Sequence, residues 1–246
     1  MKKYSVTYSF LSRVKNGFWR PDLYPLEKFL KKYFGVHNSG YFVKIGANDG
    51  LTDDPTTTFF LDLNWSGLFV EPLPDAFEKL IENLKHVGDR FTFENLGIGR
   101  SSGTIDLYYI DEKIAANLPG YVSLSASFND APLEKIVKDH QLDEHSIKNI
   151  SINTVTLDEL LFRHSVGKLN LLQIDAEGMD GEILNSYSFS IVPELIIFEH
   201  VHLDKNEYKR LCAKLKKLKY YLFYWGRDTF ALQLELKKRH IKRKFI

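Results

Sequence analysis

Short apolar segments alternate along most of the chain with segments whose apolar residues recur at helical spacing. Residues 41–47 read YFVKIGA, a nearly continuous apolar run with the length of a buried strand. Within residues 74–87, Phe77, Leu80 and Leu84 instead recur every three or four positions, as on one face of a helix. This alternation predicts an α/β fold, a doubly wound parallel sheet with helices on both faces.

The same pattern predicts seven strands and the helices between them. The strands are expected at residues 41–47, 67–72, 91–99, 169–175 and 194–201, with two more inside 220–234. The helices are expected near residues 25–34, 56–65, 74–87, 156–162, 181–187 and 204–218. Because a Gly-Arg-Asp turn at 226–228 joins the last two aromatic strands, they should close the sheet as a C-terminal antiparallel hairpin.

The chain is long enough to bury one full core. It has 246 residues, 44% of them hydrophobic, which favours a single α/β domain. We expect residues 1–40 to form an N-terminal extension with a helix, and residues 41–246 to form that domain. Residues 101–154 read differently, as a hairpin arm, a polar loop and a helix. We therefore expect an insertion there that lies over the active-site face and supplies acceptor contacts.

Charge and cysteine content exclude several classes of partner. The 33 Lys and Arg residues nearly balance the 32 Asp and Glu residues, which gives no electrostatic reason to expect nucleic acid or a membrane surface as partner. The single Cys212 excludes an internal disulfide. Arg13 and Lys15 interrupt any signal-peptide core, and no apolar run is long enough for a membrane span. The cytoplasm is the expected location.

Carboxylates stand where several predicted strands end. Glu71 ends the second strand, Asp175 and Glu177 follow the strand at 169–175, and Glu199 closes the strand at 194–201. In open α/β sheets, ligands bind outside the carboxyl ends of the strands. A carboxylate there reaches solvent and ligand, whereas one placed two residues earlier would be desolvated at high cost. These four residues therefore mark the predicted site.

A glycine loop follows the first strand, and its spacing indicates an adenosine site. Gly46-Ala47-Asn48-Asp49-Gly50 can admit a ligand close to the backbone, and Glu71 can accept hydrogen bonds from ribose hydroxyls. An ordinary turn followed by a solvated glutamate is the alternative. The G-x-x-x-G spacing and Asp49 disfavour a dinucleotide, because its pyrophosphate would meet a negative charge. S-adenosyl-L-methionine has no phosphate, and its positive sulfonium and amino groups suit this loop.

Separate sequence blocks together resemble one known family. The blocks are YFVKIGANDG, WSGLFVEPLPDAFEKL, NLGIG, VTLDELL, LLQIDAEGMDGEIL and LIIFEH. In this order and spacing, over roughly residues 40–202, the chain resembles the FkbM-type family of S-adenosylmethionine-dependent methyltransferases. The sequence departs from the family pattern at Gln173, where a lysine is expected, and in the histidine-rich EHVH segment.

The resemblance implies a fold, an activity and cofactor contacts. It implies the class I methyltransferase (Rossmann-like) seven-stranded sheet, and O-methylation of a hydroxyl on a sugar, glycan or natural product. It also implies cofactor contacts at Gly46, Asn48 and Glu71 and near Asn95 to Gly97. With the loop and strand-end residues, the expected cofactor set is Gly46, Asn48, Asp49, Gly50, Glu71, Asn95, Gly97 and Glu177.

Methylation of an alcohol also needs a group that removes its proton. Asp175, His200 and His202 are the candidates, and we expect Asp175 to orient or deprotonate the acceptor with help from His200. Glu199 is included among the catalytic residues, because Asp175 and Glu199 could instead hold a divalent cation such as Mg²⁺. Capping of the next helix is the alternative for Asp175 and Glu177.

A small molecule or a glycan is the expected acceptor. Ser125, Ser127 and His202 are the predicted acceptor contacts, with an exposed polar turn as the alternative for the serines. Two other functions stay open. A metal-dependent phosphoesterase or nuclease could use the same carboxylates, and a module that only binds the cofactor could keep the fold.

Overall fold

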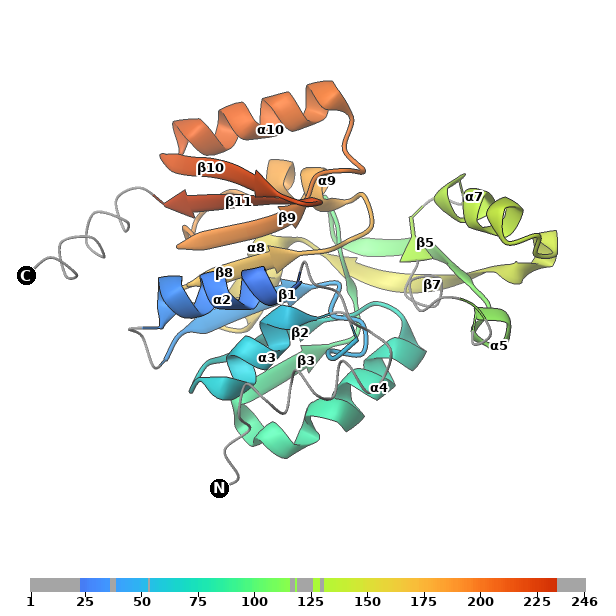
Figure 1. Cartoon of the computed structure of the whole chain (residues 1–246), viewed down its shortest axis with the longest axis horizontal. Helices are drawn as coiled ribbons and strands as arrows, with labels where there is room; N and C mark the ends of the chain where they lie inside the picture. Colours follow the sequence, from blue (N-terminus) through green and yellow to red (C-terminus); the bar gives the residue numbers. More distant parts are fainter. Residues whose placement is uncertain are drawn as a thin grey trace, which may run out of the picture.

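Seven strands form one mixed sheet in the centre of the molecule (Figure 1). The computed structural model describes residues 23–35, 39–52, 54–115, 118, 126–128 and 131–233. The strand order is β10-β11-β9-β8-β1-β2-β3. The bounds are β1 (Tyr41–Ile45), β2 (Ser66–Val70), β3 (Phe91–Glu94), β8 (Leu171–Ile174), β9 (Leu195–Glu199), β10 (Tyr220–Trp225) and β11 (Asp228–Gln233). Strand β11 runs antiparallel to both neighbours, so the predicted C-terminal hairpin is confirmed.

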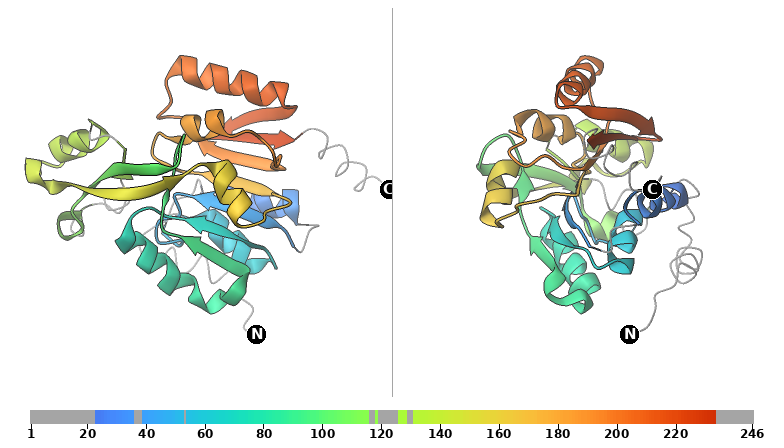
Figure 2. Two further views of the ribbon diagram at one scale, coloured as in Figure 1. Left: turned by 180° about the vertical axis from the view of Figure 1, so that it is seen from behind. Right: turned by 90° about the vertical axis from the view of Figure 1, so that its left-hand side faces the viewer.

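Helices cover both faces of this sheet, as the alternating pattern predicts (Figures 1 and 2). Helices α2 (Leu23–Phe34), α3 (Pro55–Asp62) and α4 (Pro74–Leu84), the last followed by the 3₁₀ helix η1 (Lys85–Arg90), contribute to the core on one face. Helices α8 (Leu157–Arg163), α9 (Asp180–Ser186) and α10 (Lys205–Lys217) contribute to the core on the other. Successive residues of β1 serve the two cores in turn, since Phe42 belongs to the first and Val43 to the second.

A second sheet of four strands stands beside the main one, in the order β4-β7-β5-β6. Its strands are β4 (Gly97–Ile98), β5 (Gly103–Ile110), β6 (Ala126–Ser127) and β7 (Ile147–Val155). The single strand predicted at 91–99 is therefore wrong, because the chain leaves the main sheet after Glu94. The Asn95 side chain donates to the backbone oxygens of Glu71 and Pro72 at this break. Strand β7 was not predicted, because polar residues occupy its exposed positions and the segment has no continuous apolar run.

Strands β5 and β7 carry an arm that projects away from the main sheet (Figures 1 and 2). It includes α5 (Glu112–Ala115), α7 (Ala131–Asp139) and the 3₁₀ helix η2 (Glu144–Ser146). A small core of its own, formed by Ile110, Ala115, Leu133 and Val137, holds these pieces together. The arm falls in the region of the expected insertion at 101–154, and the placement of that insertion over the active-site face stays a prediction. Ser125 lies outside the described residues.

A buried ion pair links the first strand to the helix that follows it. Lys44 is the fourth of the five residues of β1, and its Nζ is 2.9 Å from Asp54 Oδ2, with both side chains only 5% exposed. Asp54 also caps α3, since its carboxylate accepts from the backbone N–H groups of Thr56 and Thr57. Lys44 pairs with Gln173 in the register of β1 and β8. Gln173, where the family pattern leads one to expect a lysine, thus lies beside the lysine of the neighbouring strand.

No helix in the described ranges is long and apolar enough to cross a membrane.

Removal of the Lys44 charge should destabilise the fold strongly. In Lys44→Met the Asp54 carboxylate stays buried without its cation, so the free energy of unfolding should fall by about 3–5 kcal/mol. Urea unfolding of both proteins measures this difference. The matched control is Lys85→Met, which breaks an exposed pair with Glu82 and should cost less than about 1 kcal/mol. Equal small losses in the two variants would contradict the account.

Candidate active site

The strand register aligns the residues that follow each strand in one row across the sheet. Glu199 pairs with Asp228, and Asp228 pairs with Trp225. From β9 to β3 the last paired residues of the strands are Phe198, Ile174, Ile45, Val70 and Glu94. Extending this pairing by one position gives a row, here called the edge row: Trp225, Asp228, Glu199, Asp175, Gly46, Glu71 and Asn95.

Backbone hydrogen bonds continue the pairing into the edge row. Asp175 N–H donates to Ile45 O, and Gly46 N–H donates to Val70 O, each at 3.0 Å. Glu71 N–H likewise donates to Glu94 O at 3.0 Å. Predicted site residues from distant parts of the sequence therefore lie side by side at the carboxyl edge of the parallel strands.

Glycine in the loop after β1 is required by close packing. Gly46 has φ +74°, and a Cβ there would lie 1.8 Å from the backbone oxygen of Asp175. Gly50 also has φ +74°, and a Cβ there would lie 2.5 Å from a methyl group of Leu80. Only glycine combines a positive φ with the absence of a side chain, so it fits both positions without strain. These two residues hold the loop tightly against β8 and α4, which brings the loop backbone into the edge row.

Glu71 fixes the same loop from the second strand. The residue is 5% exposed, and its carboxylate accepts from the backbone N–H groups of Asn48 at 2.7 Å and Leu73 at 2.9 Å. Burial raises the pKa of Glu71 to about 7, although the two N–H donors oppose this effect. The Asp49 carboxylate accepts from the backbone N–H groups of Leu51 and Thr52. Asp49 therefore stabilises the turn of the loop itself.

The loop after β8 holds the second group of predicted residues. Glu177 and Gly178 have φ values of 46° and 100°, so the backbone turns sharply there. Helix α9 begins at Asp180, and its N-cap, Met179, makes no side-chain capping bond. Within the described residues, neither Asp175 nor Glu177 caps α9.

Asp180 connects this loop to the next strand, and the sequence interpretation did not include it. The residue is fully buried, and its carboxylate accepts from Glu199 N–H at 2.9 Å and from Ala176 N–H at 3.2 Å. It therefore fixes the end of β9 against the loop that follows β8. The available signal was a third acidic residue in the segment DAEGMDGEIL, directly at the start of the helix.

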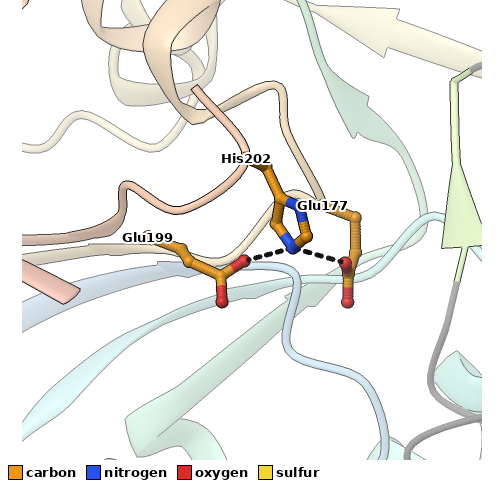
Figure 3. Close-up of side chains that lie close together, drawn as sticks. All are labelled: Glu177, Glu199 and His202. Carbon is orange, nitrogen blue, oxygen red and sulfur yellow. Dashed lines mark ion pairs between the residues drawn. The ribbon is translucent and has the colours of Figure 1, made fainter. Parts of the chain in front are cut away.

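Glu177, Glu199 and His202 converge above the ends of β8 and β9 (Figure 3). His202 Nε2 lies 3.1 Å from Glu199 Oε2 and 3.9 Å from Glu177 Oε2. One ligand atom from each residue lies within 4.8 Å of the others, so this set could hold a metal ion. From the sequence, Asp175 and Glu199 were the expected ligands of a divalent cation. Asp175 does not belong to the set found here.

Arg227 already provides a positive charge at this set. Its Nε donates to Glu199 Oε1 at 2.5 Å, and its Nη2 lies 3.0 Å from His202 Nε2. The sequence interpretation read Arg227 and Asp228 only as part of a turn. Strand β11 lies between β9 and β10, which brings this turn to the ends of the parallel strands.

The carboxylates of the edge row and of Glu177 beside it raise one another's pKa values. Burial and the Glu199 charge raise the pKa of Asp175, whereas Lys44 lowers it. The Asp175 side chain is exposed to solvent, so water screens part of this effect. Burial, followed by Asp175 and Glu199, raises the pKa of Glu177 to about 8. The same causes raise the pKa of Asp228 to about 7. The site therefore favours a positively charged ligand.

Three further predicted residues lie away from the edge row. His200 follows Glu199, and adjacent residues of a strand point to opposite faces. The His200 ring lies against Thr229 Oγ1 at 3.1 Å and stacks on Tyr208, and no contact joins it to Asp175 in the described part of the structure. Gly97 is buried in β4, and Ser127 is buried in β6 of the arm. Their predicted roles remain predictions.

Comparison with known proteins identifies the family. The FkbM methyltransferase domain matches residues 44–222, and the chain belongs to this family. The predicted family and the class I methyltransferase fold are thus confirmed. The hexuronic acid methyltransferase AglP of Haloferax volcanii is 26% identical over 148 residues, which are 59% of this chain and 52% of AglP. The chain spans about half the length of this curated relative.

Solved structures with similar folds are more distant in sequence. The FkbM methyltransferase of Methylobacillus flagellatus KT has a TM-score of 0.47 and 12% identity, and the match covers 79% of this chain and 44% of that one. The METTL16 methyltransferase domain has a TM-score of 0.46 and 11% identity, covering 86% of this chain and 66% of that one.

The raised pKa of Asp228 should make stability depend on pH. The folded protein keeps a proton on Asp228 that the unfolded chain, with an ordinary pKa near 3.8, releases. The free energy of unfolding should therefore fall as the pH rises from about 4 to about 7. Urea unfolding between about pH 5 and pH 8 measures this slope, which should be shallower in Asp228→Asn. Parallel curves for the two proteins would contradict the assignment.

Proposed function

We propose that this protein is an S-adenosylmethionine-dependent methyltransferase that methylates a hydroxyl of a sugar or glycan. The edge row carries this proposal, because it brings the glycine loop and Glu71 directly beside Asp175 and Glu199. Membership of the FkbM family supports methyl transfer over cleavage of a phosphoester. The name of the relative AglP, a hexuronic acid methyltransferase, supports a sugar acid as the class of acceptor.

The charge of the site fits this cofactor. Glu71 and Asp228 have pKa values raised to about 7, and Glu177 to about 8, since burial and neighbouring carboxylates disfavour their ionised forms. A positively charged ligand relieves this repulsion. Glu71 would accept hydrogen bonds from the ribose, and the backbone around Gly46 and Asn48 would hold the amino acid end. The bound cofactor would supply an electrophilic methyl group on its sulfonium.

Asp175 is the group best suited to act on the acceptor. It lies in the edge row between Gly46 and Glu199, and it is open to solvent. It would hold the acceptor hydroxyl in place and accept its proton as the new bond forms. A raised pKa brings Asp175 closer to the neutral range, which suits a general base. His200 contacts Thr229 and Tyr208, so we assign the proton transfer to Asp175 alone.

We further propose that methyl transfer needs no divalent cation. Arg227 contacts both Glu199 and His202, two of the three residues that could hold an ion. Its guanidinium is a permanent cation and supplies the positive charge that these groups require. A bound ion would have to compete with Arg227 for the Nε2 lone pair of His202.

Glu71→Ala should weaken cofactor binding. Loss of hydrogen bonds to the carboxylate should cost about 1.5–3 kcal/mol of binding free energy for S-adenosylmethionine, which calorimetry measures. Glu78→Ala, at an exposed position of α4, is the matched control and should bind as the wild type does. Thermal unfolding of both variants shows whether the fold is kept. A wild-type protein that binds NAD but neither S-adenosylmethionine nor S-adenosylhomocysteine would overturn the proposal.

Asp175→Asn should lower turnover by about a hundredfold or more while cofactor affinity stays close to that of the wild type. The change keeps the size of the side chain but removes its ability to take a proton. Transfer of a radiolabelled methyl group to sugar acids and glycans is the assay. Glu182→Gln on α9 is the control, since Glu182 pairs with Arg100 outside the edge row.

Three results would decide against parts of this scheme. Near-normal turnover of Asp175→Asn would remove Asp175 from the chemistry. Loss of activity in EDTA that Mg²⁺ or Mn²⁺ restores would assign Glu177, Glu199 and His202 to a metal ion. Tight cofactor binding without transfer to any sugar acceptor would favour a module that only binds the cofactor.

A further inference from the structure

Two large aromatic residues are exposed at the end of the edge strand β10. Tyr224 is 75% exposed and Trp225 is 38% exposed, whereas Trp65 is fully buried. Both stand directly before the turn that carries Gly226 and Arg227. These four residues, Tyr224, Trp225, Gly226 and Arg227, are called the hairpin tip. Exposed aromatic side chains at the rim of a site commonly take part in binding.

The hairpin tip enters the edge row through Trp225. Trp225 pairs with Asp228, and Asp228 pairs with Glu199. Trp225 and Asp175 stand on strands three places apart in the sheet order. At about 4.8 Å between neighbouring strands, they are separated by about 14 Å along the row. A group bound at Trp225 thus lies farther from Asp175 than one pyranose ring extends.

Arg227 gives the hairpin tip fixed hydrogen-bond donors. Its Nε is held by Glu199, and its side chain is 59% exposed. The guanidinium has five N–H groups, and its contacts with Glu199 and His202 leave others directed to solvent. A donor held in this way loses little conformational freedom when it binds a ligand.

An aromatic ring beside fixed donors matches the surface of a sugar. A pyranose has an apolar C–H face that packs on an aromatic ring, and a rim of hydroxyls that accept hydrogen bonds. A protein partner would bury the charged side chains of Arg227, Glu177 and His202 at a desolvation cost, whereas sugar hydroxyls replace their water. These charged groups close to Glu199 therefore favour a carbohydrate as the occupant.

We propose that the hairpin tip binds a second sugar of the acceptor, so that the acceptor is a glycan chain and not a free monosaccharide. Trp225 packs against the ring of that sugar, and Arg227 donates to its hydroxyl or carboxylate oxygens. The methylated sugar lies between this position and the glycine loop, next to Asp175. This inference rests on the proposed function and adds that the acceptor has at least two sugars.

Tyr221 offers a matched control within the same strand. It is 50% exposed and lies four residues before Trp225, on the same side of β10. At about 3.3 Å per residue it stands about 13 Å from the edge row. An aromatic residue of similar exposure on the same strand is thus available outside the proposed sugar site.

The test is binding to a glycan array that carries sugars from monosaccharides to hexasaccharides, with and without uronic acids. The protein is first saturated with S-adenosylhomocysteine, whose affinity calorimetry measures for every variant. The wild type should bind chains of two or more sugars and not the matching monosaccharides. Trp225→Ala and Arg227→Gln should each weaken this binding about tenfold or more. Trp225→Phe, which keeps a ring, and Tyr221→Ala should retain it.

The outcomes separate this inference from the proposed function. If the wild type did not bind S-adenosylhomocysteine, the proposed function itself would be overturned. Normal S-adenosylhomocysteine binding with equal affinity for monosaccharides and longer chains would overturn the inference alone. The inference would also fall if Trp225→Ala and Tyr221→Ala had the same effect, or if no glycan bound.

Discussion

The parallel register of β8, β1 and β2 is the constraint on which the rest of the site depends. Because parallel strands end together, the first residue after each of them falls in one row across the sheet. Backbone bonds from Asp175, Gly46 and Glu71 extend that row beyond the strands themselves. The close approach of Gly46 to the backbone of Asp175 leaves no room for a larger residue. Two loops more than a hundred residues apart in sequence are thereby fixed against each other.

This row concentrates negative charge, and the fold offsets it only in part. Lys44 lies beneath the row and lowers the pKa of Asp175, and Arg227 reaches Glu199 from the hairpin turn. Asp180 is satisfied by two backbone N–H groups, which oppose the rise of its pKa by burial. Within the described residues, no backbone N–H group donates to the Glu177 carboxylate, and the pKa of Glu177 rises to about 8. A site with this balance is suited to a ligand that carries positive charge.

The sequence predicts the main sheet well because most of its strands are short, nearly continuous apolar runs, and because the register then aligns their ends. Glu71 and Asp175 could be found in this way. Arg227 could not, since its importance depends on β11 lying between β9 and β10, a long-range pairing that no local pattern reveals. The contacts of His200 with Thr229 and Tyr208 could not be predicted either, because one residue along a strand reverses the face to which the side chain points. Strand β7 escaped notice since its exposed positions carry polar residues.

A crystal structure of the protein with S-adenosylhomocysteine tests the central claim most directly. The claim is that the edge row orders the site, with the cofactor over β1 and β2 and the acceptor beyond Asp175. The account predicts the ribose beside Glu71 and the sulfur atom between the loop at Gly46 and Asp175. Density for the ligand on the other side of Asp175, toward Trp225, or away from the edge row altogether, would contradict it.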